Sequence, residues 1–292
     1  MSKEKRRFGD RRDGKLIRQQ DAMHLIMPMI YPNRCDNEAF ISERIDLTNI
    51  DKYLAAKNAE NPEFKYTLFH LIVAAILKTI ILRPKLNRFI ANKNNYQRNT
   101  YSASFVVKKQ FTDSSEEGMA FVYATEDSTI ESLHEELRRQ IYREKKSSGA
   151  GNATSNTMDI LNKLPRWFVK FFIWLMRQLD RHGMVPQSII EADPYYASVI
   201  LSNLGSIKLR SGYHHLTNWG TTSIFVVVGE MKERIFRNEN GEDEYRNSVD
   251  LGLTIDERLA DGYYYSKSVR LLKYILEHPE CLERPFSEPV DY

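Results

Sequence analysis

The sequence lacks the features that mark secreted, metal-binding and membrane-spanning proteins. Its two cysteines, Cys35 and Cys281, lie far apart and form no Cys-x-x-Cys motif, which argues against a zinc site or a disulfide framework. The first nine residues are charged and contain no apolar core, so we expect no signal peptide and a cytoplasmic location. We also expect no metal site and no permanently bound cofactor.

An excess of charge of one sign is missing as well. Lysine and arginine total 42 against 39 acidic residues, and the net charge of +3 is too small to indicate a nucleic-acid partner. The 292 residues are enough for one large domain. We expect a basic N-terminal arm over 1–15, a single domain over 16–285 with a helical insertion near 146–192, and a tail over 286–292.

The first 18 residues are locally basic. Their positive charge would suit nucleic acid or anionic lipid, but a solvated or subunit-crossing tail is the favoured interpretation. The cations are Lys3, Lys5, Arg6, Arg7, Arg11, Arg12, Lys15 and Arg18.

Helical and strand patterns alternate along the chain and end in antiparallel hairpins. This order predicts an α+β fold, with helices layered on a mixed sheet. Helices are expected over 16–31, from Thr48 as an N-cap, and over 65–82, 129–145, 164–180 and 263–276. Strands are expected over 35–47, 86–90, 101–109, 118–125, 195–202, 222–229, 230–237 and 244–255, and a linker over 146–156.

Two of these helices are unusually apolar. The segment 65–82 is apolar nearly all round, which predicts a buried helix and makes His70 a packed histidine rather than a catalyst. The segment 164–180 combines a dense aromatic run with Arg166, Lys170 and Arg177 near one face. A core helix or channel wall is favoured for it, and contact with a membrane surface is the alternative.

A charged turn, Asp256-Glu257-Arg258-Leu259-Ala260-Asp261-Gly262, joins the last strand to the last helix. From its spacing alone, the turn is a solvated connection with Asp261 capping the helix. Turns of this kind also hold side chains for chemistry, so other parts of the sequence must distinguish the two interpretations.

The turn and several earlier segments resemble the catalytic domain of the 2-oxo acid dehydrogenase acyltransferases, such as dihydrolipoamide acetyltransferase, which shares the chloramphenicol acetyltransferase fold. That family carries Asp-His-Arg-x-x-Asp-Gly before its final helix, and four of these positions match here. Its Ser-Asn-x-Gly turn is similar to Ser202-Asn203-Leu204-Gly205, and its Pro-Glu-Leu-Asn to Pro84-Lys85-Leu86-Asn87. The residues Asn218 and Ser223 resemble part of its Asn-Pro-Pro-Gln-Ser, although Trp219-Gly220 replaces the prolines. The matching turn positions are Asp256, Arg258, Asp261 and Gly262.

The resemblance implies a set of catalytic roles with one departure. Glu257 stands where the family has the histidine that takes the proton from a thiol attacking a thioester. Ser202, followed by Asn203, would hydrogen-bond the oxyanion of the tetrahedral intermediate. Asp261 would fix the local geometry through an arginine, with Arg34 or Arg258 as support.

Glutamate is a weaker base than the imidazole it replaces. A thiol of pKa about 8.5 gives its proton to an imidazole at a cost of about 2.7 kcal/mol, and to an ordinary glutamate at about 5.7 kcal/mol. The difference of about 3 kcal/mol is about two orders of magnitude in rate. Burial in a dry site would raise the glutamate pKa and remove the deficit. His214 or His215 could supply an imidazole instead, but the matched fold places their loop elsewhere.

The resemblance therefore implies an acyltransferase that moves an acyl group from a coenzyme A thioester, or another thioester, to a small acceptor. In this fold the active site lies between subunits, so a homotrimer is expected. The alternative is a catalytically inactive trimeric binding or scaffold protein of the same fold. We expect no lipoyl domain, so membership of a dehydrogenase complex does not follow from the resemblance.

Overall fold

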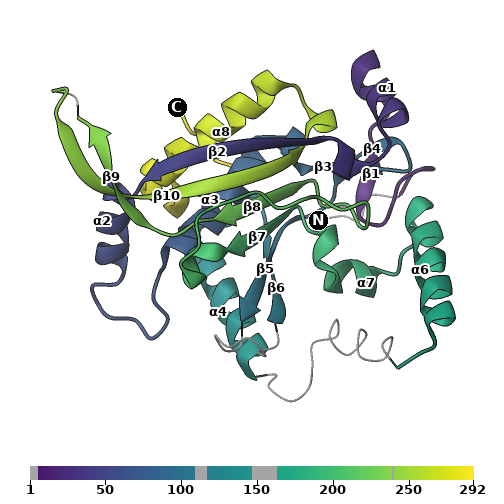
Figure 1. Ribbon diagram of the computed structural model, residues 1–292, viewed down its shortest axis with the longest axis horizontal. Helices are drawn as coiled ribbons and strands as arrows, with labels where there is room; N and C mark the ends of the chain where they lie inside the picture. Colours follow the sequence, from purple (N-terminus) through teal and green to yellow (C-terminus); the bar gives the residue numbers. More distant parts are fainter. Residues whose placement is uncertain (1–5, 109–116, 147–162, 239) are drawn as a thin grey trace.

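A mixed β-sheet is the centre of the molecule. The computed structural model describes residues 6–108, 117–146, 163–238 and 240–292. Nearly all of the linker expected over 146–156 lies outside these residues. In the sheet, the strands follow the order β2-β10-β8-β7-β5-β6, and β9 pairs with the first half of β10 (Figure 1). The bounds are β2 Glu38–Asp46, β5 Tyr101–Lys108, β6 Glu117–Ala124, β7 Val199–Asn203, β8 Ile224–Val228, β9 Lys232–Arg237 and β10 Asp243–Asp256.

Strand direction divides this sheet into two kinds of pairing. β7 runs parallel to both β5 and β8, whereas the remaining neighbours are antiparallel. The sheet is therefore mixed, as the sequence predicts. A separate three-stranded sheet has the order β1-β4-β3, with bounds β1 Gly14–Leu16, β4 Asn94–Arg98 and β3 Arg88–Ala91.

The main core lies between the large sheet and a layer of helices. α3 (Leu68–Leu82) contacts both α4 (Ile130–Lys146) and α8 (Gly262–Glu277), while α8 packs on β2 and α4 on β6. α2 (Thr48–Lys57) contacts α8 at the end of this layer. Twelve residues of α3 are buried, which confirms the expected buried helix. This arrangement leaves the turn before α8 at the end of β10, beside α1 (Ala22–Ile30) (Figure 1).

The opposite face of the sheet is covered by the connection between β7 and β8. Leu216 of this connection packs on Ile200, Phe225 and Val227. Earlier in the connection, the backbone passes so close to β10 that a Cβ at Gly252 would overlap the carbonyl oxygen of Gly212. Glycine is therefore required at position 252 for the loop to lie flat on the strand.

Several predicted elements differ from the structure. The helix expected over 16–31 is wrong in its first turn and a half, because Gly14–Leu16 forms a strand and α1 begins only at Ala22. Thr48 is the first residue of α2 rather than its N-cap, and the carboxylate of Asp46 accepts hydrogen bonds from its backbone nitrogen (2.9 Å) and its hydroxyl (2.6 Å).

The helix expected over 164–180 is present as α6 (Arg166–Arg181), but the interpretation as a core helix is wrong. Only Met176 on it is buried, and the Trp167 side chain is 71% exposed. No helix in the described part of the chain is long and apolar enough to cross a membrane. α7 (Gln187–Ala192) follows α6 and packs with it through Ile189 and Ile190.

The start of α3 makes folding stability depend on pH. His70 is buried, and its Nδ1 accepts a hydrogen bond from the backbone nitrogen of Thr67 (3.2 Å), which completes a capping box. Burial, assisted by the nearby His134, lowers the pKa of His70 to about 3 from its ordinary value of 6.5. The imidazole is therefore neutral in the folded chain at pH 7.

The free energy of unfolding is expected to fall by about 1.4 kcal/mol for each pH unit below about 6.5. Below that pH, His70 of the unfolded chain binds a proton, whereas buried His70 of the folded chain stays neutral. This contribution is complete above pH 6.5 and is lost progressively toward pH 3. Urea unfolding of the wild type and of His70→Gln, which keeps a capping-box acceptor, measures it. The variant should show the flatter pH dependence. Equal slopes in the two proteins, or the same flattening in the exposed-site control His182→Gln, would contradict the assignment.

Candidate active site

The turn that joins β10 to α8 holds Glu257 in a fixed position. Residues Glu257–Leu259 form one turn of 3-10 helix, and the carboxylate of Asp256 caps it through the backbone nitrogen of Arg258 (3.2 Å). The backbone nitrogen of Glu257 donates to the carbonyl of Asn37 (3.0 Å). The Glu257 side chain is exposed and pairs with no described residue. The backbone is therefore anchored while the carboxylate stays available.

A buried ion pair holds this turn in place. Arg258 donates through Nε (2.8 Å) and Nη2 (2.6 Å) to the two carboxylate oxygens of Asp256. Asp256 is completely buried and Arg258 is 2% exposed. The hydroxyl of Tyr265, on the first turn of α8, donates to the Asp256 carbonyl (2.7 Å). Glu257 is thus the exposed residue between two buried, mutually bonded neighbours.

Arg34 is a second buried cation at the same carboxylate. Its Nε lies 3.7 Å from Oδ2 of Asp256, an ion pair too long for a hydrogen bond. Burial lowers the pKa of Arg34, and the Asp256 carboxylate opposes that effect. Its other guanidinium nitrogens hold three backbone carbonyls in place, those of Thr217, Gly220 and Ile90.

No arginine in the described part of the chain pairs with Asp261. Its carboxylate caps α8 by accepting from the backbone nitrogen of Tyr264 (2.8 Å), and this hydrogen bond lowers the pKa of Asp261. The expected capping role is confirmed. The expectation that Asp261 keeps an arginine partner is wrong, because Arg34 and Arg258 both hold Asp256. Gly262 follows as the first residue of α8, with open space at its Cβ position.

Glu257 lines a groove between β2, the end of β10 and α8. The groove has a volume of about 550 Å³. Its apolar lining comes from Met27, Ala39, Ile41, Ile255 and Val269, and its polar groups are those of Glu43, Glu257, Asp261, Tyr265, Ser266 and Arg270. Glu257 therefore presents its carboxylate at the wall of a partly apolar groove.

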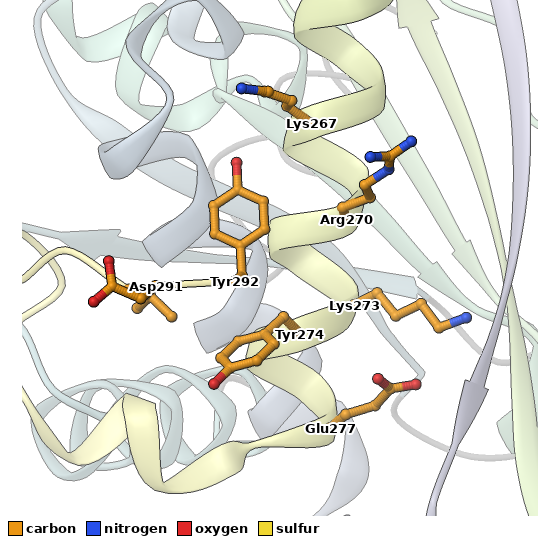
Figure 2. A pocket seen from close by; sticks show the side chains of 8 residues that line it. Lys267, Arg270, Lys273, Tyr274, Glu277, Asp291 and Tyr292 are labelled. Atoms are coloured by element: carbon orange, nitrogen blue, oxygen red, sulfur yellow. The ribbon is translucent and has the colours of Figure 1, made fainter. Parts of the chain in front are cut away.

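A second hollow lies farther along α8 and has a volume of about 540 Å³. Arg270 lines both hollows. Figure 2 shows Arg270 and Lys273 leaving α8 on the side away from Tyr292. Because Glu277 and Asp291 also line this hollow, its cations and anions are mixed.

Ser202 lies at the other end of the sheet from Glu257. It is on β7 beside Val227 of β8, and Val227 in turn pairs with Gly252 of β10. Five residues along β10 separate Gly252 from Glu257, a distance of about 16 Å at about 3.3 Å per residue. The side chain of the adjacent Asn203 accepts from the backbone nitrogen of Ser206 (3.3 Å) and so shapes the turn after β7. One chain therefore does not bring Ser202 and Glu257 together.

The loop after β7 returns to the Glu257 end of the sheet. Asn218 accepts from the backbone nitrogen of Arg34 (2.7 Å) and donates to Sγ of Cys35 (3.1 Å). His215 is exposed, and its carbonyl lies 3.4 Å from Nδ1 of His214. Ser223 is buried, and its carbonyl accepts from the backbone nitrogen of Asp256 (3.0 Å). Asn218 and Ser223 thus support the turn that carries Glu257.

Two residues of this site are not predicted from the sequence. Asn37 is 2% exposed, positions Glu257 through its carbonyl, and donates from its own amide to the carbonyl of Asn33 (2.7 Å). Tyr265 is the other, and burial raises the pKa of its hydroxyl well above the ordinary value. Its place one helical turn after Asp261 was the available signal, since that spacing points it back at the strand end.

The sequence matches no protein-family model and no curated protein. Solved structures do match. A probable dihydrolipoamide acetyltransferase from Listeria monocytogenes is 15% identical with a TM-score of 0.57, covering 88% of this chain and 89% of its own. The dihydrolipoamide acetyltransferase of Azotobacter vinelandii is 15% identical with a TM-score of 0.58, and the match covers 92% of this chain and 94% of that one. A chloramphenicol acetyltransferase is 12% identical with a TM-score of 0.55, and the match covers 90% of this chain and 99% of that one.

The chain has the chloramphenicol acetyltransferase-like fold. The likeness extends over about nine tenths of the chain, so the large sheet and its helical layer are both included. At these identities the likeness concerns the fold, and the chemistry must be argued from the residues of the turn and groove.

Proposed function

We propose that the protein transfers an acyl group from a coenzyme A thioester to a small acceptor, with Glu257 as the general base. The observation that carries the proposal is the bracing of the turn. The buried Asp256–Arg258 pair holds the residue between them out over the groove of about 550 Å³. A side chain that is anchored on both flanks and forms no hydrogen bond or ion pair with a described residue is suited to act on a ligand.

The reaction needs one proton transfer and one bond exchange. Glu257 takes the proton from the nucleophilic atom of the acceptor as that atom attacks the thioester carbonyl carbon. The tetrahedral oxyanion accepts a hydrogen bond from Ser202. The carbon–sulfur bond then breaks, and the leaving thiolate recovers the proton from Glu257. The acyl group ends on the acceptor, and coenzyme A is released as the thiol.

Such a site must be assembled from more than one copy of the chain. Ser202 of β7 is in register, across β8, with Gly252 of β10, and Gly252 lies about 16 Å along β10 from Glu257 at about 3.3 Å per residue. A homotrimer in which Ser202 of one subunit faces Glu257 of the next joins the two halves. The same contact would cover the open side of the groove and exclude water from Glu257.

Titration with coenzyme A and acetyl-coenzyme A tests this assignment. We expect binding by calorimetry at one site per subunit, in a species whose mass by light scattering is three times that of the chain. The variant Ile41→Arg places a bulky cation in the groove that Glu257 lines and should abolish the binding heat. A monomeric protein, or one that binds neither compound, would contradict the proposal. Binding without turnover of any acceptor would support an inactive scaffold instead.

A further inference from the structure

Helix α6 presents three different stripes along its length. Phe172, Met176 and Leu179 pack inward on a small cluster that includes Val185 and Tyr196. At about 100° per residue, a second stripe about 120° wide carries five large apolar side chains. These are Trp167, Phe168, Phe171, Trp174 and Leu175, all exposed, with 71% exposure at Trp167 and 54% at Trp174.

The third stripe consists of cations only. Four positively charged residues fall within about 60° of the helix circumference, next to the exposed aromatic stripe. They are Arg166, Lys170, Arg177 and Arg181, and each is exposed. The acidic residue of α6, Asp180, is turned inward, where it accepts from Arg11 (2.7 Å) and from the hydroxyl of Tyr196 (3.0 Å). The outward surface of α6 therefore combines aromatic rings with positive charges that form no ion pair with a described acidic residue.

The N-terminal segment from Arg7 to Arg12 adds further basic residues near the end of α6. Arg11 ties it to the end of α6 by donating to the carboxylate and the carbonyl of Asp180. Phe8 is fully exposed, and Arg7 and Arg12 near it are exposed as well. An exposed aromatic ring among arginines thus adjoins the end of α6, repeating the composition of that helix.

We propose that α6 and the adjoining N-terminal segment dock on an anionic phospholipid surface. Tryptophan and phenylalanine side chains enter the boundary between headgroups and acyl chains, and a flanking row of cations binds the phosphates. The helix of 16 residues is about 24 Å long, so it lies on the bilayer rather than across it. Pairing of two α6 helices about a twofold axis is the weaker choice, because their cationic stripes would meet. The inference is independent of the acyl-transfer proposal.

Flotation of the full-length protein with vesicles tests the docking surface. We expect co-flotation with vesicles of equal parts phosphatidylcholine and phosphatidylglycerol, loss of co-flotation with pure phosphatidylcholine, and weakening by salt. The emission of Trp167 and Trp174 should shift to shorter wavelength on binding. Wild-type protein that stays unbound with the anionic vesicles would overturn the proposal without recourse to any variant.

Paired variants identify the residues. Lys170→Glu with Arg177→Glu should lower the vesicle affinity by at least about twenty-fivefold, from about fivefold for each positive charge removed. Trp167→Ser with Trp174→Ser should abolish binding. The matched controls, Lys52→Glu with Lys65→Glu and Met231→Ser with Tyr245→Ser, change exposed residues elsewhere and should bind as wild type. Unchanged binding in both α6 variants, or a smaller oligomer in the tryptophan variant by light scattering, would overturn the assignment to lipid.

Discussion

Replacement of Glu257 by glutamine is expected to lower acyl transfer from acetyl-coenzyme A by about 10²- to 10⁴-fold, the usual contribution of a general base. Glutamine has nearly the same shape but cannot accept the proton. The side chain is exposed and pairs with no described residue, so the fold should be unaffected. Release of free coenzyme A in the presence of a small dithiol such as dihydrolipoamide measures the loss, and binding of acetyl-coenzyme A should persist.

The control for this variant is Glu280→Gln. Glu280, like Glu257, is an exposed glutamate in the first turn of a 3-10 helix, but it lies at the far end of α8. Its activity should stay within about twofold of wild type, which is far below the effect of removing a base. Activity of Glu257→Gln equal to that of the control would remove Glu257 from the mechanism.

Coexpression of Glu257→Gln with Ser202→Ala distinguishes a site between subunits from a site within one. Mixed oligomers contain some interfaces with an intact Ser202 from one copy and an intact Glu257 from another. These interfaces should restore part of the activity that each variant lacks alone. No recovery in proven mixed oligomers would contradict the shared site.

The second large effect is expected at the buried ion pair. Asp256→Asn should lower the free energy of unfolding by about 3–5 kcal/mol, because it leaves the guanidinium groups of Arg258 and Arg34 buried without their carboxylate. Urea unfolding at equal protein concentration measures the change, since assembly also contributes to stability.

Asp250→Asn is the matched control on the same strand. Asp250 also receives an arginine, Arg234, at 2.6 Å, but both side chains keep about a fifth of their surface in solvent. Such pairs contribute about 1 kcal/mol or less. Equal losses in the two variants would show that burial of Asp256 does not determine its contribution.

The sequence was most informative where hydrophobic pattern and burial agree. The buried α3, the strand pair β5–β6 and the hairpin from β9 to β10 all follow from periodicity and turn residues. β4 was missed because Asn94–Arg98 is almost entirely polar and pairs between β1 and β3 through its backbone. A strand that is held by the backbone of its partners shows no alternating apolar pattern by which a single sequence could reveal it.

The limits at the site have a similar cause. Helical spacing identified α6, but an apolar helix has the same pattern whether its second face meets a core or remains exposed. The resemblance placed the arginines near the turn, yet the choice of Asp256 over Asp261 depends on Arg34, which arrives from more than 200 residues earlier. Contacts over such separations are set by tertiary packing, which local spacing does not encode.

The bracing of the turn also bears on how such a protein changes over evolution. Asp256 and Arg258 fix the backbone through bonds that do not involve the side chain between them. The side chain at position 257 can therefore be replaced without a loss of folding stability. A lineage can exchange one proton acceptor for another at this place, or give it up, while the scaffold around it persists.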